Sequence, residues 1–288
     1  MNKSVLYSGL LAAALFSSVA HAADSADQVA QAEFANRAYS AAGIVSATNA
    51  ALDYDKAAQA AATPLLKAQY LIKESASYYF VGDATSDTAG KITAFLKGEG
   101  IADQAAKILG NNIDVPSVQT PALNALKASL KPEELGLLGD ALYYRAINLG
   151  QWGQANGVIS SLSKWGELRH NLEIIDTLGL TAIHDYGSSR VLGRAYTKLP
   201  SLAGGDYKKA LKLLSNAVSK TLVPGQIYSR DGYNNIYYAD VLHELGNDDK
   251  ARAILTAFVK GDPNTINPAT VPELTEAQKE AKDDMAGW

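Results

Sequence analysis

The chain has 288 residues, with 26 Lys and Arg against 30 Asp and Glu, and 47% of its residues are hydrophobic. This apolar content supports a packed core and argues against a disordered chain. The absence of cysteine excludes disulfides, thiolate metal sites and cysteine nucleophiles. A net charge of −4 without a basic block offers no footprint for a nucleic-acid backbone, so we expect no nucleic-acid partner.

Residues 1–22 have the three parts of a cleavable signal peptide. Lys3 provides a positive start, Val5–Ala20 is an apolar run, and Ala20-His21-Ala22 matches the small-residue cleavage pattern. The apolar run falls short of the roughly 20 residues that a spanning helix needs, although a retained anchor is the alternative. We therefore predict a periplasmic protein that begins at Ala23 and does not insert in the membrane after cleavage. Without cysteine its new N-terminus cannot be lipidated.

Apolar residues recur with helical spacing through the mature chain. One helix face is clearest between Tyr238 and Leu245, and the same offsets recur between Ala251 and Phe258, after Gly246. No stretch shows the alternating pattern and hairpin turns that a sheet needs. The sequence therefore predicts an all-α fold.

Three glycines share a spacing that predicts helical hairpins. Each precedes an alanine by five residues: Gly150 and Ala155, Gly205 and Ala210, Gly246 and Ala251. The glycine permits a tight turn and the alanine lets the second helix close on the first, which is typical of tetratricopeptide hairpins. Because the intervals are irregular, we predict irregular tetratricopeptide-like hairpins stacked into a short solenoid. An unrelated helical bundle with glycine turns is the alternative.

We expect one helical-repeat domain over residues 23–288. Residues 23–130 form a less regular half, 131–260 carry the repeat-like hairpins, and 261–288 form a linker and a last helix.

Three local signals mark boundaries within this domain. Asn111–Thr120, which contains a proline and two asparagines, predicts a loop. Pro132, followed by two glutamates, predicts a helix start. Thr270 with Glu273 predicts a capping box for the last helix.

Six sequence blocks between Leu71 and Val259 resemble the TRAP transporter T-component family of periplasmic tetratricopeptide-like proteins. They are Tyr78-Tyr79-x-x-Gly82, Phe95-x-Lys97-Gly98, Tyr144-Arg145-Ala146-x-Asn148-Leu149-Gly150-Gln151-Trp152, the run from Tyr186 to Tyr196 with Pro200, Gly205-Asp206-x-x-x-Ala210, and Tyr238-Ala239-Asp240 before Leu245-Gly246. The resemblance implies a helical-repeat fold and a protein partner, namely a periplasmic solute-binding protein.

Catalytic motifs are incomplete in this chain. The H-E-x-x-H match at His243 lacks its second histidine, and the S-x-x-K match at Ser161 lacks its companion motifs. His184 and Asp185 are the remaining pair that could supply a general base. We expect no enzyme, metal site or cofactor, and keep an envelope hydrolase that uses His184 and Asp185 as the least favoured alternative.

Arg190 and Arg194 stand one helical turn apart on one face. Like charges at this spacing cost about 0.2 to 0.5 kcal/mol unless an anion lies between them. One hypothesis is an internal clamp on an acid such as Asp185, Glu173 or Asp240. The other is recognition of a carboxylate on a ligand or partner.

Tyrosine is unusually frequent, with 15 Tyr against 5 Phe and 3 Trp. Three Tyr-Tyr pairs fall on the first helices of predicted hairpins, where one ring can pack in the core and the other can face the inner surface, on which solenoids bind. We predict a ligand or partner cleft formed by Tyr144, Trp152, Tyr186, Arg190, Arg194 and Tyr238.

The sequence thus predicts a non-enzymatic periplasmic helical-repeat protein that binds a partner protein, with a small organic ligand as a second expected occupant of its cleft. The alternative is a general cell-envelope scaffold that holds no small ligand.

Overall fold

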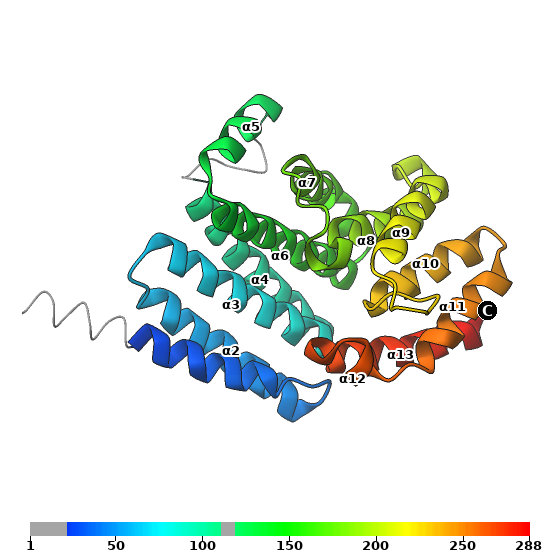
Figure 1. Ribbon diagram of the computed structural model, residues 1–288, viewed down its shortest axis with the longest axis horizontal. Coiled ribbons are helices and arrows are strands. Elements are labelled where there is room, and N and C mark those ends of the chain that lie inside the picture. Colours follow the sequence, from blue (N-terminus) through cyan, green and yellow to red (C-terminus); the bar gives the residue numbers. More distant parts are fainter. Residues whose placement is uncertain (1–21, 111–118) are drawn as a thin grey trace, which may run out of the picture. The chain divides into compact units, whose positions relative to one another are not determined.

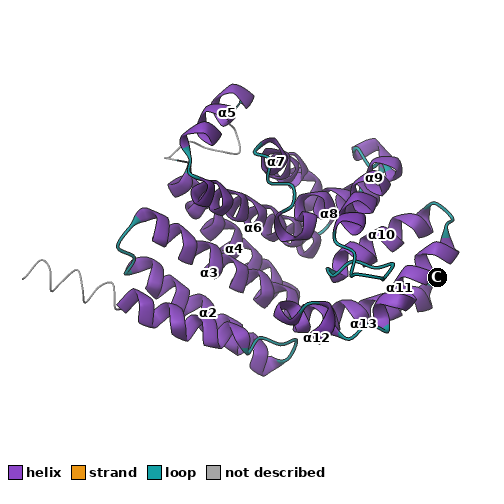
Figure 2. Ribbon diagram, in the orientation of Figure 1, coloured by secondary structure: helices purple, strands orange, loops and turns teal. Residues whose placement is uncertain are grey.

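The computed structural model describes residues 22–110 and 119–288. Within these ranges the predicted all-α fold is confirmed, because helix follows helix and no strand forms (Figures 1 and 2). The proposed signal peptide up to His21 and most of the predicted loop Asn111–Thr120 lie outside the described residues. In the described ranges, no helix has the length and apolar character needed to cross a membrane.

The chain forms two compact units, Met1–Leu178 and Gly179–Trp288, and each is described by itself. This boundary lies beyond the division near residue 130 that the sequence suggested. Residues 131–178 belong to the first unit because their first helix packs against two of its preceding helices, and their second helix packs on the first.

In the first unit, residues 22–35 are helical and are followed by α2 (Ala41–Gln59), α3 (Pro64–Ala84), α4 (Thr88–Leu109), α5 (Thr120–Ser129), α6 (Pro132–Asn156) and α7 (Val158–Thr177). The helix pairs α3/α4 and α6/α7 form hairpins, and α4 packs on α6. α3 also packs on α6, so the first helices of these two hairpins touch each other. This arrangement is that of stacked helical repeats.

The second unit contains α8 (Ile183–Lys198), η2 (Ser201–Ala203), α9 (Tyr207–Lys220), α10 (Gly232–Glu244), α11 (Asp248–Val259), α12 (Pro263–Ile266), η3 (Pro268–Thr270) and α13 (Val271–Gly287). The pairs α8/α9 and α10/α11 form hairpins. α10 packs on both α8 and α13, which places the three helices in one layer.

Most helices begin at the residues that their sequences favour. Ser40, Thr63, Asp87, Asp206 and Asp231 cap α2, α3, α4, α9 and α10 by accepting hydrogen bonds from backbone N–H groups of the first turn.

The two starts predicted individually have different outcomes. Pro132 begins α6, as predicted, and the Glu134 carboxylate accepts a bond of 2.8 Å from the Lys131 backbone N–H. Thr270 occupies the N-cap position of α13, but its side chain makes no capping bond, so the predicted capping box is wrong.

One polar contact recurs in three hairpins. A lysine on the second helix donates to the hydroxyl of a buried first-helix tyrosine: Lys97 to Tyr78 at 2.6 Å, Lys209 to Tyr196 at 2.5 Å and Lys250 to Tyr238 at 2.9 Å. Each ammonium also lies within 6 Å of the ring centroid, in cation–π range. The next residue is always small and buried: Gly98, Ala210 or Ala251. A Cβ on Gly98 would lie 2.5 Å from Asn148 Oδ1, so this glycine admits α6 of the next hairpin. The lysine ties the second helix of its hairpin to the first.

The three turns predicted at glycines have different outcomes. Gly205 and Gly246 lie in the turns before α9 and α11, as predicted. The prediction for Gly150 is wrong, because α6 continues to Asn156 and the turn falls at Gly157, whose φ is 95°. A Cβ on Gly150 would lie 2.9 Å from Leu168 Cδ1, so this glycine serves close packing of α7.

Gly246→Val should lower the free energy of unfolding by about 1 kcal/mol or more, because Gly246 has a φ of 75° and a β-branched residue is strained there. Gly100→Ala is the matched control. Gly100 lies inside α4 with no atom within 4 Å of a Cβ, so alanine should raise stability by about 0.5 to 1 kcal/mol. Urea unfolding followed by circular dichroism measures both, and equal midpoints for Gly246→Val and the wild type would contradict the turn.

Candidate functional site

The residues of the predicted cleft divide between the two units. Tyr144 and Trp152 lie on α6 of the first unit, whereas Tyr186, Arg190 and Arg194 on α8 and Tyr238 on α10 belong to the second. The last four lie on two helices that pack on each other, but their side chains have separate environments.

Arg190 binds an aspartate and a backbone carbonyl of its own unit. Its side chain is 9% exposed, and Nη1 lies 2.9 Å from Asp231 Oδ2 and 3.1 Å from the His184 carbonyl oxygen. Asp231 in turn caps α10 by accepting a bond of 2.9 Å from the Asn234 backbone N–H. Burial raises the pKa of Asp231, and the positive charge of Arg190 opposes that rise. Arg190 therefore has the contacts of the internal clamp, with Asp231 in place of the acids considered from the sequence.

The clamp secures a strained turn at the start of α8. His184, Asp185 and Tyr186 have φ values of 48°, 56° and 63°, a left-handed conformation that costs roughly 1 to 2 kcal/mol for each non-glycine residue. Asn234 Nδ2 donates to the Asp185 carbonyl at 2.9 Å, and Arg230 donates twice to Asp185 Oδ1, at 2.8 and 2.5 Å. Thus the Asp185 carboxylate is bound by a cation.

Asp231 and Asn234 are the residues that sequence reasoning missed here. Their signal was an N-cap pattern, an aspartate followed by a glycine just before the apolar stripe of α10. That pattern predicts the start of a helix, but it does not say which arginine the capping carboxylate will bind.

Arg194 lies among aromatic and acidic side chains on the layer of α8 and α10. It forms an ion pair with Asp240, which also lies 3.4 Å from Lys198 Nζ. The guanidinium lies 4.4 Å from the centroid of the Tyr237 ring, which in turn contacts Tyr233 at 5.5 Å between centroids. We call Arg194, Lys198, Tyr233, Tyr237 and Asp240 together the Arg194–Tyr237 face.

The two cations of this face, Arg194 and Lys198, are nearly balanced by nearby carboxylates, and both cations remain in contact with solvent. The side chains of Arg194 and Lys198 are 22% and 53% exposed. Asp284 of α13 lies close enough to interact with Asp240, and burial is the main reason why its pKa is raised. The face therefore combines half-exposed tyrosine rings with an arginine, the residue types that dominate binding energy at protein interfaces.

Tyr238 has a different environment from its neighbour Tyr237. It is 8% exposed and its hydroxyl accepts the bond from Lys250 inside the α10/α11 hairpin. In this Tyr-Tyr pair one ring is in the core and the other is on the layer surface, but the exposed one is Tyr237.

In the first unit, Arg145 is the main charged residue near Tyr144 and Trp152. Its buried guanidinium faces three carboxylates and an amide from α4 and α7: Glu99 and Asp103 at 3.2 Å each, Glu167 at 2.7 Å and Asn171 at 3.0 Å. Sequence reasoning missed this cluster because the acids come from two other helices. Tyr144 is half-buried, and the Trp152 indole N–H is buried without a hydrogen-bond partner among the described residues.

A second buried charge in this unit is Glu74 of α3, which is 3% exposed. Burial, reinforced by Asp55 of α2, raises the pKa of Glu74 to about 7, while Lys97 of α4 opposes the shift. The carboxyl therefore changes charge near neutral pH.

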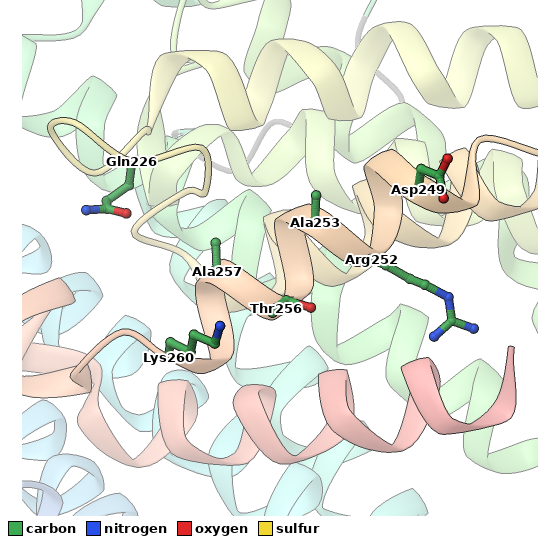
Figure 3. Close-up of a pocket in the computed structure, with 7 residues that line it drawn as sticks. All are labelled: Gln226, Asp249, Arg252, Ala253, Thr256, Ala257 and Lys260. Carbon is green, nitrogen blue, oxygen red and sulfur yellow. The ribbon is translucent and has the colours of Figure 1, made fainter.

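An open groove of about 500 Å³ follows α11 in the second unit (Figure 3). It is lined by Gln226, Asp249, Arg252, Ala253, Thr256, Ala257 and Lys260. None of the six residues predicted for the cleft lines it. Across the described ranges, no group of three or more His, Cys, Asp or Glu side chains is placed to hold a metal ion.

A comparison with protein-family models found no match for this chain, and neither did a search of curated proteins. The resemblance to the T-component family thus rests on the sequence blocks alone.

Arg190→Ala should lower the free energy of unfolding by about 3 kcal/mol, because it leaves the Asp231 carboxylate without its cation and frees the strained turn. The loss should be larger at pH 8 than at pH 5, since protonation of Asp231, whose pKa is raised, relieves the unpaired charge. Lys198→Ala, at a half-exposed cation of the same helix, should change stability by less than about 0.5 kcal/mol. Unchanged unfolding of Arg190→Ala would refute the clamp.

Glu74→Gln should stabilise the protein at pH 8 but not at pH 4. The ordinary pKa of this carboxyl is 4.5, so between pH 4.5 and about 7 the folded chain keeps a proton that the unfolded chain releases. Wild-type stability therefore falls as the pH rises through this window, by roughly 2 kcal/mol after allowance for solvent screening. Denaturant unfolding of both proteins across this range measures the difference, and a difference independent of pH would contradict the assignment.

Proposed function

We propose that this chain is an exported, non-enzymatic helical-repeat protein that binds a partner protein. The observation that carries the proposal is the Arg194–Tyr237 face, where two half-exposed tyrosine rings and an arginine lie on the layer of first helices in the second unit. Tyrosine provides a large contact area at low entropic cost, and arginine is, with tyrosine, among the residues that dominate binding energy at interfaces. Stacked helical hairpins use such surfaces for binding.

The resemblance to the T-component family suggests the first partner to test, a periplasmic solute-binding protein of a TRAP-type transport system. The signal-peptide pattern at residues 1–22 supports the same compartment. A small organic ligand remains a second proposed occupant, since Arg194 and Lys198 both approach Asp240 and could exchange that carboxylate for one on a ligand.

A contact in the second unit disfavours the hydrolase alternative. Asp185 would have to orient His184 as a base, but its Oδ1 accepts two bonds from Arg230. The scaffold alternative needs no exposed cluster of arginine and tyrosine, so the Arg194–Tyr237 face favours the binding protein.

The test uses the mature chain from Ala23, immobilised and exposed first to the solute-binding protein of a TRAP-type system from the same source and then to periplasmic extract. We expect a protein to bind to the wild type and Tyr237→Ala to weaken that binding at least tenfold, because the substitution removes the ring beneath Arg194. Tyr207→Ala is the matched control, since Tyr207 is 40% exposed on α9, outside the face.

Calorimetry with the purified partner measures the affinities, and circular dichroism confirms that both variants fold. Binding equal in Tyr237→Ala and Tyr207→Ala would remove the face from the proposal, and absence of any bound protein would overturn the binding function.

A further inference from the structure

The outward side of α11 carries small side chains where a solvent-facing helix normally carries long charged ones. Ala253 and Thr256 are exposed, and Ala257 is half-buried beside them. α9, the second helix of the preceding hairpin, instead exposes Lys208 and Lys212. The stripe on α11 therefore leaves room for another backbone to approach closely.

An anchored loop between α9 and α10 forms one wall of the groove. Ser229 of this loop is fully buried, and its backbone N–H donates to Asn235 Oδ1 at 2.6 Å. The loop nevertheless leaves Leu222 and Ile227 43% and 54% exposed and directs Gln226 to the groove. Exposed apolar side chains on an anchored loop are arranged for contact with little further loss of entropy.

The end of α13 holds Arg252, one of the residues that line the groove. Figure 3 shows Arg252 extending from α11 toward α13, where its Nη1 donates to the Met285 carbonyl at 2.9 Å. Thr256 Oγ1 also lies 3.6 Å from the Met285 sulfur. Hydrogen bonds thus hold Arg252 against α13 and the loop against α10.

The two ends of the groove carry opposite charges. Asp249 lies at the start of α11 and Lys260 just after its end, eleven residues or about 16 Å apart. Within residues 22–110 and 119–288, neither side chain has a hydrogen-bond or ion-pair partner. A ligand that complements the groove needs a basic group near Asp249 and an acidic group near Lys260.

We propose that this groove binds an amphipathic helix of a partner protein, lying antiparallel to α11. Its apolar stripe would rest on Ala253 and Ala257, its acidic first turn at Lys260 and its basic last turn at Asp249. A helix with acids in its first turn and bases in its last is also favoured by its own dipole, and antiparallel placement brings both ends to the matching charges. This inference rests on the proposed binding function and gives it a second surface.

The experiment selects 14-residue peptides from a displayed library on the immobilised mature chain and measures the affinity of the enriched peptides by fluorescence anisotropy. We expect amphipathic helical sequences with an acidic first turn and a basic last turn. Ala257→Arg should weaken their binding at least tenfold by filling the floor of the groove. Lys212→Glu, on the exposed side of α9, is the control and should leave binding unchanged.

A charge exchange tests the orientation. Lys260→Glu should weaken the selected peptide several-fold, and a peptide whose first turn is changed from acidic to basic should recover the affinity with this variant. Recovery with the wild type instead would overturn the antiparallel placement.

Three outcomes would overturn the groove as the seat of a partner helix. In the first, the enriched peptides bind Ala257→Arg as tightly as the wild type. In the second, the selection enriches no helical sequence. In the third, the wild type sediments as a dimer that Ala257→Arg converts to monomers, which would assign the groove to a second copy. If, in those cases, a partner protein still binds the wild type more tightly than Tyr237→Ala, the proposed function stands without the groove. If no partner protein binds at all, the proposed function and the groove proposal are both wrong.

Discussion

Contact between a second-helix lysine and a buried first-helix tyrosine ties together the two helices of three hairpins, and the direction of the side chains beside each tyrosine depends on it. In each case the lysine immediately precedes a small buried residue, namely Gly98, Ala210 or Ala251. The three lysines are exposed, so each bond contributes about 0.5 to 1.5 kcal/mol, which favours the register in which the bond forms. Once Tyr238 is held in the α10/α11 hairpin, its neighbour Tyr237 is directed to Arg194 on the other side of α10.

Arginines placed inside each unit hold the hairpins together by gathering acids from neighbouring helices. Arg145 draws Glu99 and Asp103 of α4 and Glu167 of α7 toward α6, and Arg190 of α8 binds the aspartate that caps α10. Such buried charges are weak sources of net stability because desolvation offsets their attraction, but removal of one partner is costly. Their effect is therefore on which arrangement forms. Arg194 differs because its guanidinium, although paired with Asp240, stays partly in solvent against Tyr237.

The left-handed turn at residues 184–186 shows how local preference yields to tertiary contacts. Neither histidine, aspartate nor tyrosine favours positive φ, and three in succession would not persist in an isolated segment. Arg190, Arg230 and Asn234 bind two of its carbonyls and its carboxylate, and these bonds offset the strain. The pair that resembled a catalytic histidine and its orienting acid is thereby part of a backbone support, with the acid committed to Arg230.

The sequence by itself determined the all-α class, the helix start at Pro132 and the turns at Gly205 and Gly246, because periodicity and backbone preference are local properties of the chain. It also predicted that Arg190 and Arg194 need anions, and that one ring of the Tyr237-Tyr238 pair packs in the core while the other lies on the surface. Only the tertiary structure decided that Asp231 and Asp240 are those anions, that Tyr237 is the exposed ring, and that Gly150 lies inside α6 to admit Leu168. Those outcomes depend on which helices pack together and on their relative positions along the helix axes. Both are determined by contacts between residues far apart in the chain.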